Sequence, residues 1–207
     1  MTSSRNELLL TGEVQEAPRF SHENHGRRFV RFPLAVPRLS GQVDLLPILL
    51  PEELAWKVEA GQKVEVRGQL RSYNNRSGVG NRLLLSVLAR EIVPGGETAQ
   101  NEALLSGVLC KVPIFRRTPL GRSICDLMLA VPRRYGRADY IPVIAWGQLA
   151  METRLLEVGA PLSLEGRFQS RGYQKVTEAG CEERTALEVS MMHLLHDDAE
   201  TAKAEDL

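Results

Sequence analysis

The second half of this 207-residue chain places aromatic residues next to clusters of positive charge. Aromatic residues make up only 5% of the chain, so their positions are more informative than their number. Arginines flank Tyr135 on both sides, and Tyr173 lies between Arg171 and Lys175. A flat ring stacks on a nucleic-acid base of any identity, while cations neutralise the neighbouring phosphates. The pattern favours contact with a nucleic acid at these two tyrosines.

Two further rings, Tyr140 and Trp146, bound an apolar segment in which every second residue shares one face of a β-strand. Both rings therefore project from the same face, together with Pro142 and Ile144. The residues between them point to the opposite side. A packing role, with the indole covering a hydrophobic core, is an equally good interpretation of Trp146.

Cations surround these rings and crowd the preceding hairpin. Taken singly, such charges are ordinary solvated surface, and only their interleaving with aromatic residues indicates a phosphate-binding surface. The candidate cations are Arg116, Arg117, Arg122, Arg133, Arg134, Arg137, Arg171 and Lys175.

The first half of the chain repeats the second at a spacing of 95 residues, since LAVPR at 34–38 returns at 129–133. This period is far longer than that of solenoid repeats, so each copy is expected to be a complete domain. We call the two copies the N-terminal copy and the C-terminal copy. Other matched pairs are Gly12 and Gly107, Asp44 and Asp139, and Pro47 and Pro142.

Within each copy, apolar residues alternate with period two and are interrupted by Gly, Asn and Ser, which predicts five β-strands. One helical segment is expected after the third strand, at residues 51–59 and again at 146–158. An all-β fold of two tandem OB-folds, each a five-stranded Greek-key barrel with a helix between strands 3 and 4, fits this order. A generic five-stranded barrel or sandwich would give nearly the same pattern.

Four segments are expected along the chain. A first OB-fold covers residues 1–95, a linker covers 96–103, a second OB-fold covers 104–194, and an acidic polar tail covers 195–207.

The formal net charge of zero conceals an uneven distribution of charge along the chain. Residues 1–95 carry 13 Lys and Arg against 10 Asp and Glu, and residues 105–192 carry 12 against 9. The tail from Asp197 onward carries five acidic residues against Lys203 alone, so it offsets most of the positive charge of the two copies. Basic domains with an acidic tail suit a nucleic-acid binder that screens its own groove, although ordinary surface charge explains the same numbers.

Metal, cofactor and membrane functions find no support in the sequence. Cys110, Cys125 and Cys181 form no CxxC pair and match no zinc template, which suits a reducing compartment. No apolar run approaches the roughly 18 residues that span a bilayer, and the N-terminal run is too short for a signal peptide. No phosphate-binding loop motif occurs. We expect a cytoplasmic protein without cofactor, metal, enzymatic activity or membrane partner.

Four stretches of the C-terminal copy carry a family likeness: LLSGVLCKVPIFRRTPLGRSICDLMLAV, DYIPVIAWGQLA, LLEVGAPLSLEGRFQSRGY and TALEVSMMHL. Through them, residues 104–194 resemble the DNA-binding domain of bacterial single-stranded DNA-binding proteins. The N-terminal copy resembles the family more weakly, through LTGEV, LAVP and EAGQKVEVRGQLRS. The resemblance implies base stacking at Tyr135, Tyr140, Trp146 and Tyr173.

The N-terminal copy has no ring at any of these four positions. Only Tyr73, and Phe20 and Phe29 in the first hairpin, could substitute there. Arg38 and Arg71 are candidate cations, and we expect weak binding combined with a role in assembly. The residues at the four positions are Ser40, Leu45, Pro51 and Asn75.

The resemblance implies sequence-nonspecific binding and protection of single-stranded DNA in replication, recombination or repair. Four OB-folds commonly form the working unit of the family, so two per chain imply a homodimer. The family's acidic C-terminal tip with its Pro-Phe pair is absent here, which puts recruitment of replication or repair proteins in doubt. The alternatives are a primosomal accessory protein of the same fold and a protein–protein scaffold whose OB-folds have lost DNA binding.

Overall fold

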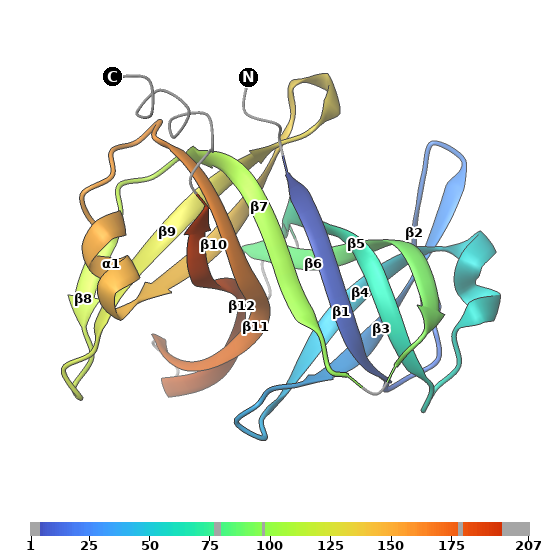
Figure 1. The fold of residues 1–207 in the computed structure, drawn as a ribbon. Coiled ribbons are helices and arrows are strands. Elements are labelled where there is room, and N and C mark those ends of the chain that lie inside the picture. The colour runs from blue at the N-terminus through green and yellow to red at the C-terminus, as the bar shows by residue number, and fades with distance from the viewer. Residues whose placement is uncertain (1–4, 77–79, 97, 178–179, 196–207) are drawn as a thin grey trace, which may run out of the picture. The chain divides into compact units, whose positions relative to one another are not determined.

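The structure, a computed structural model, describes residues 5–76, 80–96, 98–177 and 180–195 (Figure 1), with the side chains of 175–177 outside that description. Strands dominate these ranges, so the expectation of a mostly β protein is confirmed. The chain divides into two compact units. The N-terminal unit consists of Glu7–Ala103 and Arg167–Val189, and the C-terminal unit is built on Leu104–Gly166 with the described residues 5–6 and 190–195.

The N-terminal unit contains a closed ring of five strands. The strand order is β2-β3-β4-β6-β5-β1, and β1 closes the ring by also pairing with β3. In that closure Glu13 lies opposite Ala35 and Val14 opposite Leu34. The elements are β1 (Asn6–Val14), β2 (Arg19–Asn24), β3 (Arg27–Pro37), β4 (Val43–Pro51), the 3-10 helix η1 (Glu52–Lys57), β5 (Lys63–Asn74) and β6 (Leu83–Pro94).

The second group of strands follows the same plan. Its order is β7-β11-β12-β10-β9-β8, and β7 closes the ring by pairing with β9. Val108 lies opposite Ala130 and Leu109 opposite Leu129, so each pair falls 95 residues after its counterpart in the N-terminal unit. The elements are β7 (Asn101–Leu109), β8 (Ile114–Arg117), β9 (Ser123–Pro132), the 3-10 turn η2 (Arg134–Gly136), β10 (Ala138–Trp146), α1 (Gly147–Thr153), β11 (Pro161–Thr177) and β12 (Gly180–Leu195).

Strands β11 and β12 are unusually long, at 17 and 16 residues, where strands of globular proteins usually have three to ten. The ladder between them therefore continues beyond the part that belongs to the C-terminal unit. Its far segment, Arg167–Val189, belongs to the N-terminal unit. We call this segment the long hairpin.

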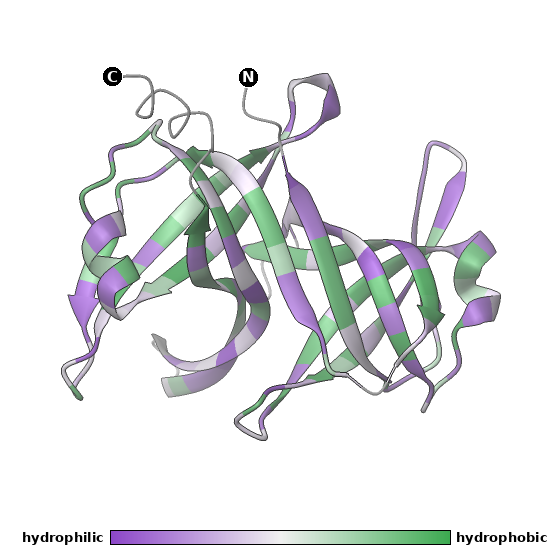
Figure 2. Ribbon diagram, in the orientation of Figure 1, coloured by the Kyte–Doolittle hydropathy of each residue, from purple (hydrophilic) through white to green (hydrophobic). Residues whose placement is uncertain are grey.

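Alternating burial explains why these residues form strands. In β3, Val30, Phe32, Leu34 and Val36 are buried, while the residues between them face outward or lie half-buried. Figure 2 shows the matching alternation of hydrophobic and hydrophilic residues along strands of both units. Each unit thus buries one face of its strands inside its own ring.

The ring closures depend on a glycine in each copy. A Cβ atom on Gly12 would lie 2.5 Å from the carbonyl oxygen of Ala35, and one on Gly107 would lie 2.4 Å from that of Ala130. Both separations are well below van der Waals contact, so only glycine allows the two backbones to approach this closely.

In each copy, one short helical segment follows the third long strand. The six-residue η1 lies between β4 and β5, and its first turn carries Glu52 and Glu53 and its last turn Lys57, which suits the helix dipole. The seven-residue α1 lies between β10 and β11 and buries Ala150 and Thr153. Nowhere in the described ranges is a helix both long and apolar enough to span a membrane.

Candidate nucleic-acid interface

Strand β10 presents two rings on the outer face of the C-terminal unit. Tyr140 is 48% exposed and Trp146 is 38% exposed, whereas Ile141 and Val143 are buried in the core. Both rings are therefore accessible from one side of the sheet, because residues six apart in a strand share a face.

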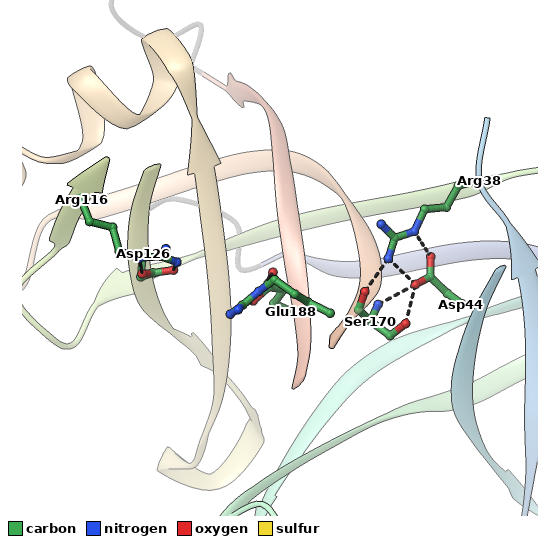
Figure 3. Close-up of polar contacts among 7 residues, drawn as sticks. Arg38, Asp44, Arg116, Asp126, Ser170 and Glu188 are labelled. Atoms are coloured by element: carbon green, nitrogen blue, oxygen red, sulfur yellow. Dashed lines mark hydrogen bonds and ion pairs between the residues drawn. The ribbon is translucent and has the colours of Figure 1, made fainter. Parts of the chain in front are cut away.

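The neighbouring strands extend this face. Ile124 of β9 lies opposite both Trp146 of β10 and Arg116 of β8. Residues directly opposed in antiparallel strands share a face, so the guanidinium and the indole flank Ile124 on the same surface. Arg116 donates to Asp126 of β9, with Nε at 2.8 Å from Oδ2 (Figure 3). Arg116 thus offers a partly neutralised charge.

The turn between β9 and β10 carries the most exposed ring of the C-terminal unit. Tyr135 is 94% exposed and adopts the left-handed backbone conformation, with φ 63° and ψ 38°. The backbone N–H of Arg133 donates to the carbonyl of Arg137 at 2.7 Å and closes this turn. A non-glycine residue at positive φ is strained, so this turn displays an exposed aromatic side chain on a strained backbone.

Four of the expected cations are exposed and form no ion pair with any side chain in the described ranges. They are therefore available to phosphate groups. These residues are Arg117, Arg122, Arg134 and Arg137.

Two other expected cations instead neutralise buried aspartates. Arg133 lies 3.4 Å from Asp139, and its counterpart Arg38 lies 2.5 Å from Asp44. Both carboxylates have fully buried side chains, and a buried charge requires a paired cation. Each arginine thus stabilises the turn that follows its strand, and only its remaining exposed edge is available to a ligand.

Asp44 is the centre of a hydrogen-bonded cluster with Ser170 of the long hairpin (Figure 3). Its carboxylate accepts from Arg38 and from the backbone N–H and hydroxyl of Ser170. Burial alone would raise the pKa of Asp44, but these donors outweigh it and hold that pKa below its ordinary value. Hydrogen bonding to Asp44 in turn raises the pKa of Arg38.

Tyr173 is half-buried in the long hairpin, within the N-terminal unit. Its hydroxyl donates to Oδ1 of Asn81 at 3.1 Å. Arg171 on the same strand forms a bidentate pair with Glu188, at 2.9 and 3.0 Å. The side chain of Lys175 lies outside the described residues.

The outer face of the N-terminal unit is aliphatic where the C-terminal unit has rings. Leu45, 57% exposed, occupies the position equivalent to Tyr140. It lines a groove of about 860 Å³ together with Pro47, Leu84 and Tyr73, whose hydroxyl is hydrogen-bonded to Ser86. Arg71 is half-buried, and its guanidinium donates to the side chain of Gln69.

Several residues at these surfaces could not be picked out from the sequence. Asn81 and Ser170 contact partners about a hundred positions away, so no local pattern reveals them. Trp56, 77% exposed, has the ammonium group of Lys57 at 5.5 Å from its ring centre. The adjacent Trp and Lys in the sequence are the signal that could have identified this surface.

The cysteines and acidic groups offer no metal centre within the described ranges, where no cluster of three or more suitable side chains occurs. Cys125 is buried, Cys110 half-buried and Cys181 exposed. Burial raises the pKa of the Cys110 and Cys125 thiols, which keeps both protonated at neutral pH.

Comparison with known proteins identifies the family that this chain resembles. Residues 100–196 match the Single-strand binding protein family. The chain is 34% identical over 102 residues to single-stranded DNA-binding protein 2 of Clostridium acetobutylicum, a match covering 42% of this chain and 77% of that relative. It is 36% identical over 81 residues to a single-stranded DNA-binding protein of Clostridium tetani, covering 36% of this chain and 56% of that relative.

A structural likeness extends over both units. The crystal structure of wild-type single-stranded DNA binding protein from Thermus aquaticus superposes with a TM-score of 0.73 at 25% identity, covering 93% of each chain. With these sequence and structural matches, the chain belongs to the single-strand binding protein family.

Proposed function

We propose that the chain binds and protects single-stranded DNA without sequence preference, in replication, recombination or repair, and acts by binding alone. The observation that carries this proposal is the surface of the C-terminal unit. It combines Tyr140 and Trp146 on one strand face with the fully displayed Tyr135. Beside Tyr135 lie Arg134 and Arg137, which form no ion pair within the described ranges.

The chemistry of this surface suits unpaired bases. Stacking on an aromatic side chain contributes about 1–3 kcal/mol per base and tolerates every base. Tyr135, Tyr140 and Trp146 are all accessible without a change of backbone conformation. Guanidinium groups on the adjoining turn would hold the phosphates, which makes the affinity salt-dependent.

We also propose that the chain consists of two tandem OB-folds, with boundaries near residues 95 and 104. Two closed five-stranded rings support this proposal. The residue pairs that close the second ring fall 95 residues after those that close the first. A helical segment also follows the third long strand in each copy. A homodimer with four such folds is the proposed assembly. The mass of the protein in solution tests it, since two chains per particle are expected.

Tryptophan fluorescence tests DNA binding directly, because the chain has only Trp56 and Trp146. Trp56 is far from the proposed stacking face in sequence and is replaced by Phe to leave Trp146 as the sole reporter. Adding a thymidine homopolymer at low salt should quench Trp146 emission, and sodium chloride should restore it. A flat titration with both the Trp56→Phe variant and the wild-type chain would overturn the proposal.

One observation favours a second role for the N-terminal unit, namely protein–protein contact. Its groove carries Leu45 at the position equivalent to Tyr140, with Leu84 beside it in the lining, and Trp56 and Phe20 are exposed elsewhere on the same unit. Exposed large apolar side chains of this kind are common at protein interfaces. A unit that supports assembly and binds DNA weakly fits this surface.

A further inference from the structure

The long hairpin lies within the compact unit formed by the N-terminal copy, although its sequence belongs to the C-terminal copy. It carries Tyr173, one of the four rings expected to stack on bases. The N-terminal copy lacks rings at the equivalent positions, so any contribution of its barrel to the binding surface must come from other contacts. The contacts of Tyr173 point to that contribution.

Midway along the two strands of the long hairpin, the side-chain amide of Asn81 bridges one strand to the other. Oδ1 of Asn81 accepts from the hydroxyl of Tyr173 at 3.1 Å, and Nδ2 donates to the carbonyl of Thr185 at 2.6 Å. The amide oxygen accepts a hydrogen bond and the amide nitrogen donates one, so these two partners fix the orientation of the side-chain amide. Arg184 adds a third contact by donating to the carbonyl of Gly80 at 3.1 Å.

Asn81 is itself fixed by Asn75, the residue that occupies the position of Tyr173 in the N-terminal copy. The side chain of Asn75 donates to the carbonyl of Asn81 at 3.1 Å, and its backbone N–H donates to the carbonyl of Arg82 at 2.7 Å. The position that carries a ring in the second copy thus carries, in the first copy, a side chain that supports that ring.

The base of the long hairpin is held by a second group of contacts. Asn101 exchanges two hydrogen bonds with the backbone of Phe168, both 2.8 Å long. Asp44 accepts from the backbone and hydroxyl of Ser170, and Arg38 donates to the Ser170 carbonyl. With anchors at its base and midway along its strands, the segment that carries Tyr173 is held against the N-terminal barrel.

We propose that the N-terminal copy positions Tyr173 for stacking, with Asn81 as the positioning residue. The proposal rests on the function proposed above. Anchoring the hydroxyl restricts the ring before DNA arrives, and a preorganised side chain loses less conformational freedom on binding. Asn81 makes no stacking contact of its own in this scheme and acts only through Tyr173.

Two variants remove the same hydrogen bond from opposite ends, Asn81→Ala and Tyr173→Phe. Each should weaken binding of a thymidine homopolymer by about three- to tenfold, the range that one net hydrogen bond supports. The double variant should bind no more weakly than either single variant. Tyr173→Ala should weaken binding further, and adding Asn81→Ala to it should change nothing more. The matched control is Asn24→Ala, an exposed asparagine in β2.

The outcomes separate the two proposals. If the wild-type chain does not bind the homopolymer, the proposed function fails. If the wild-type chain binds and Tyr135→Ala weakens it, but Asn81→Ala and Tyr173→Phe bind normally or their effects add, only the positioning role fails. If Asn81→Ala lowers the thermal midpoint, its weaker binding could reflect a loss of stability. The binding of Tyr173→Phe then tests the positioning role, because that change removes only one hydroxyl group.

Discussion

The carboxylate of Asp44 accepts two hydrogen bonds from Ser170, one from its backbone N–H and one from its hydroxyl, each 2.7 Å long. The two residues are 126 positions apart in the chain. This cluster makes part of the stability of the N-terminal unit depend on an ionised carboxylate, and that dependence can be measured.

We expect the folded state to lose stability in acid through Asp44. The folded-state pKa of Asp44 lies below its ordinary value of about 3.9. Between these two values the unfolded chain binds a proton that the folded chain does not, so stability rises with pH and is fully present above about pH 5. Asp44→Asn should reduce stability at pH 7 by about 2 kcal/mol, with a difference that narrows in acid.

Urea unfolding followed by circular dichroism from pH 3 to pH 7 measures this effect. Glu53→Gln is the control, because the Glu53–Arg27 pair is exposed on both sides and contributes little. Parallel pH profiles for wild type and Asp44→Asn would contradict the assignment.

Tyr135→Asn should separate binding from folding. The ring is 94% exposed, and asparagine tolerates the left-handed backbone at φ 63°, so the thermal midpoint should not fall. Loss of one stacking ring should weaken binding to a thymidine homopolymer about 5- to 150-fold, corresponding to about 1–3 kcal/mol. The control is Leu39→Asn, which alters a 92% exposed residue in the equivalent turn of the N-terminal copy. Equal losses in both variants would argue against a role for the ring.

Arg134 and Arg137 should determine much of the salt dependence of binding. Replacing either arginine by Gln should lower the slope of log affinity against log salt concentration by about 0.7 for each phosphate that is no longer neutralised. Arg67→Gln is the matched control, because Arg67 is exposed but paired with Glu65 on β5. Titrations at four salt concentrations measure the slopes. Unchanged slopes for both the Arg134 and the Arg137 variants would exclude phosphate binding at this turn.

Gly107→Ala should destabilise the C-terminal barrel. The added methyl group would meet the Ala130 carbonyl oxygen at 2.4 Å, so β7 and β9 would have to separate. We expect a loss of about 1–3 kcal/mol, measured by thermal or urea unfolding. Gly96→Ala is the control, because a methyl group there meets nothing within 4 Å. A stability equal to that of wild type would show that the closure adapts without cost.

The mostly β fold and the family follow from the sequence, and both are confirmed. A side chain's face in a strand depends only on its place in an alternating pattern, which is why exposed Tyr140 beside buried Ile141 can be predicted locally. The roles of Arg38 and Arg133 cannot be predicted from the local sequence. Each resembles a surface cation until a hairpin brings its buried aspartate alongside.

The assignment of the long hairpin to the N-terminal unit is equally invisible in the sequence. Tyr173 and Asn81 are 92 positions apart, and no local sequence motif around either residue predicts their contact. A repeat predicts two self-contained domains, and only the folded chain reveals a shared element. DNA binding by individual residues stays a prediction for the experiments above.

Because the long hairpin belongs to the N-terminal unit, the two halves of the sequence would not be equivalent if each were produced alone. If the C-terminal half were produced by itself, residues 167–189 would be without the surface on which they fold. The N-terminal half produced alone would keep that surface but lack Tyr173. If the positioning role proposed for Asn81 holds, the C-terminal half needs the N-terminal half for full binding, although the N-terminal copy lacks rings at the four equivalent positions.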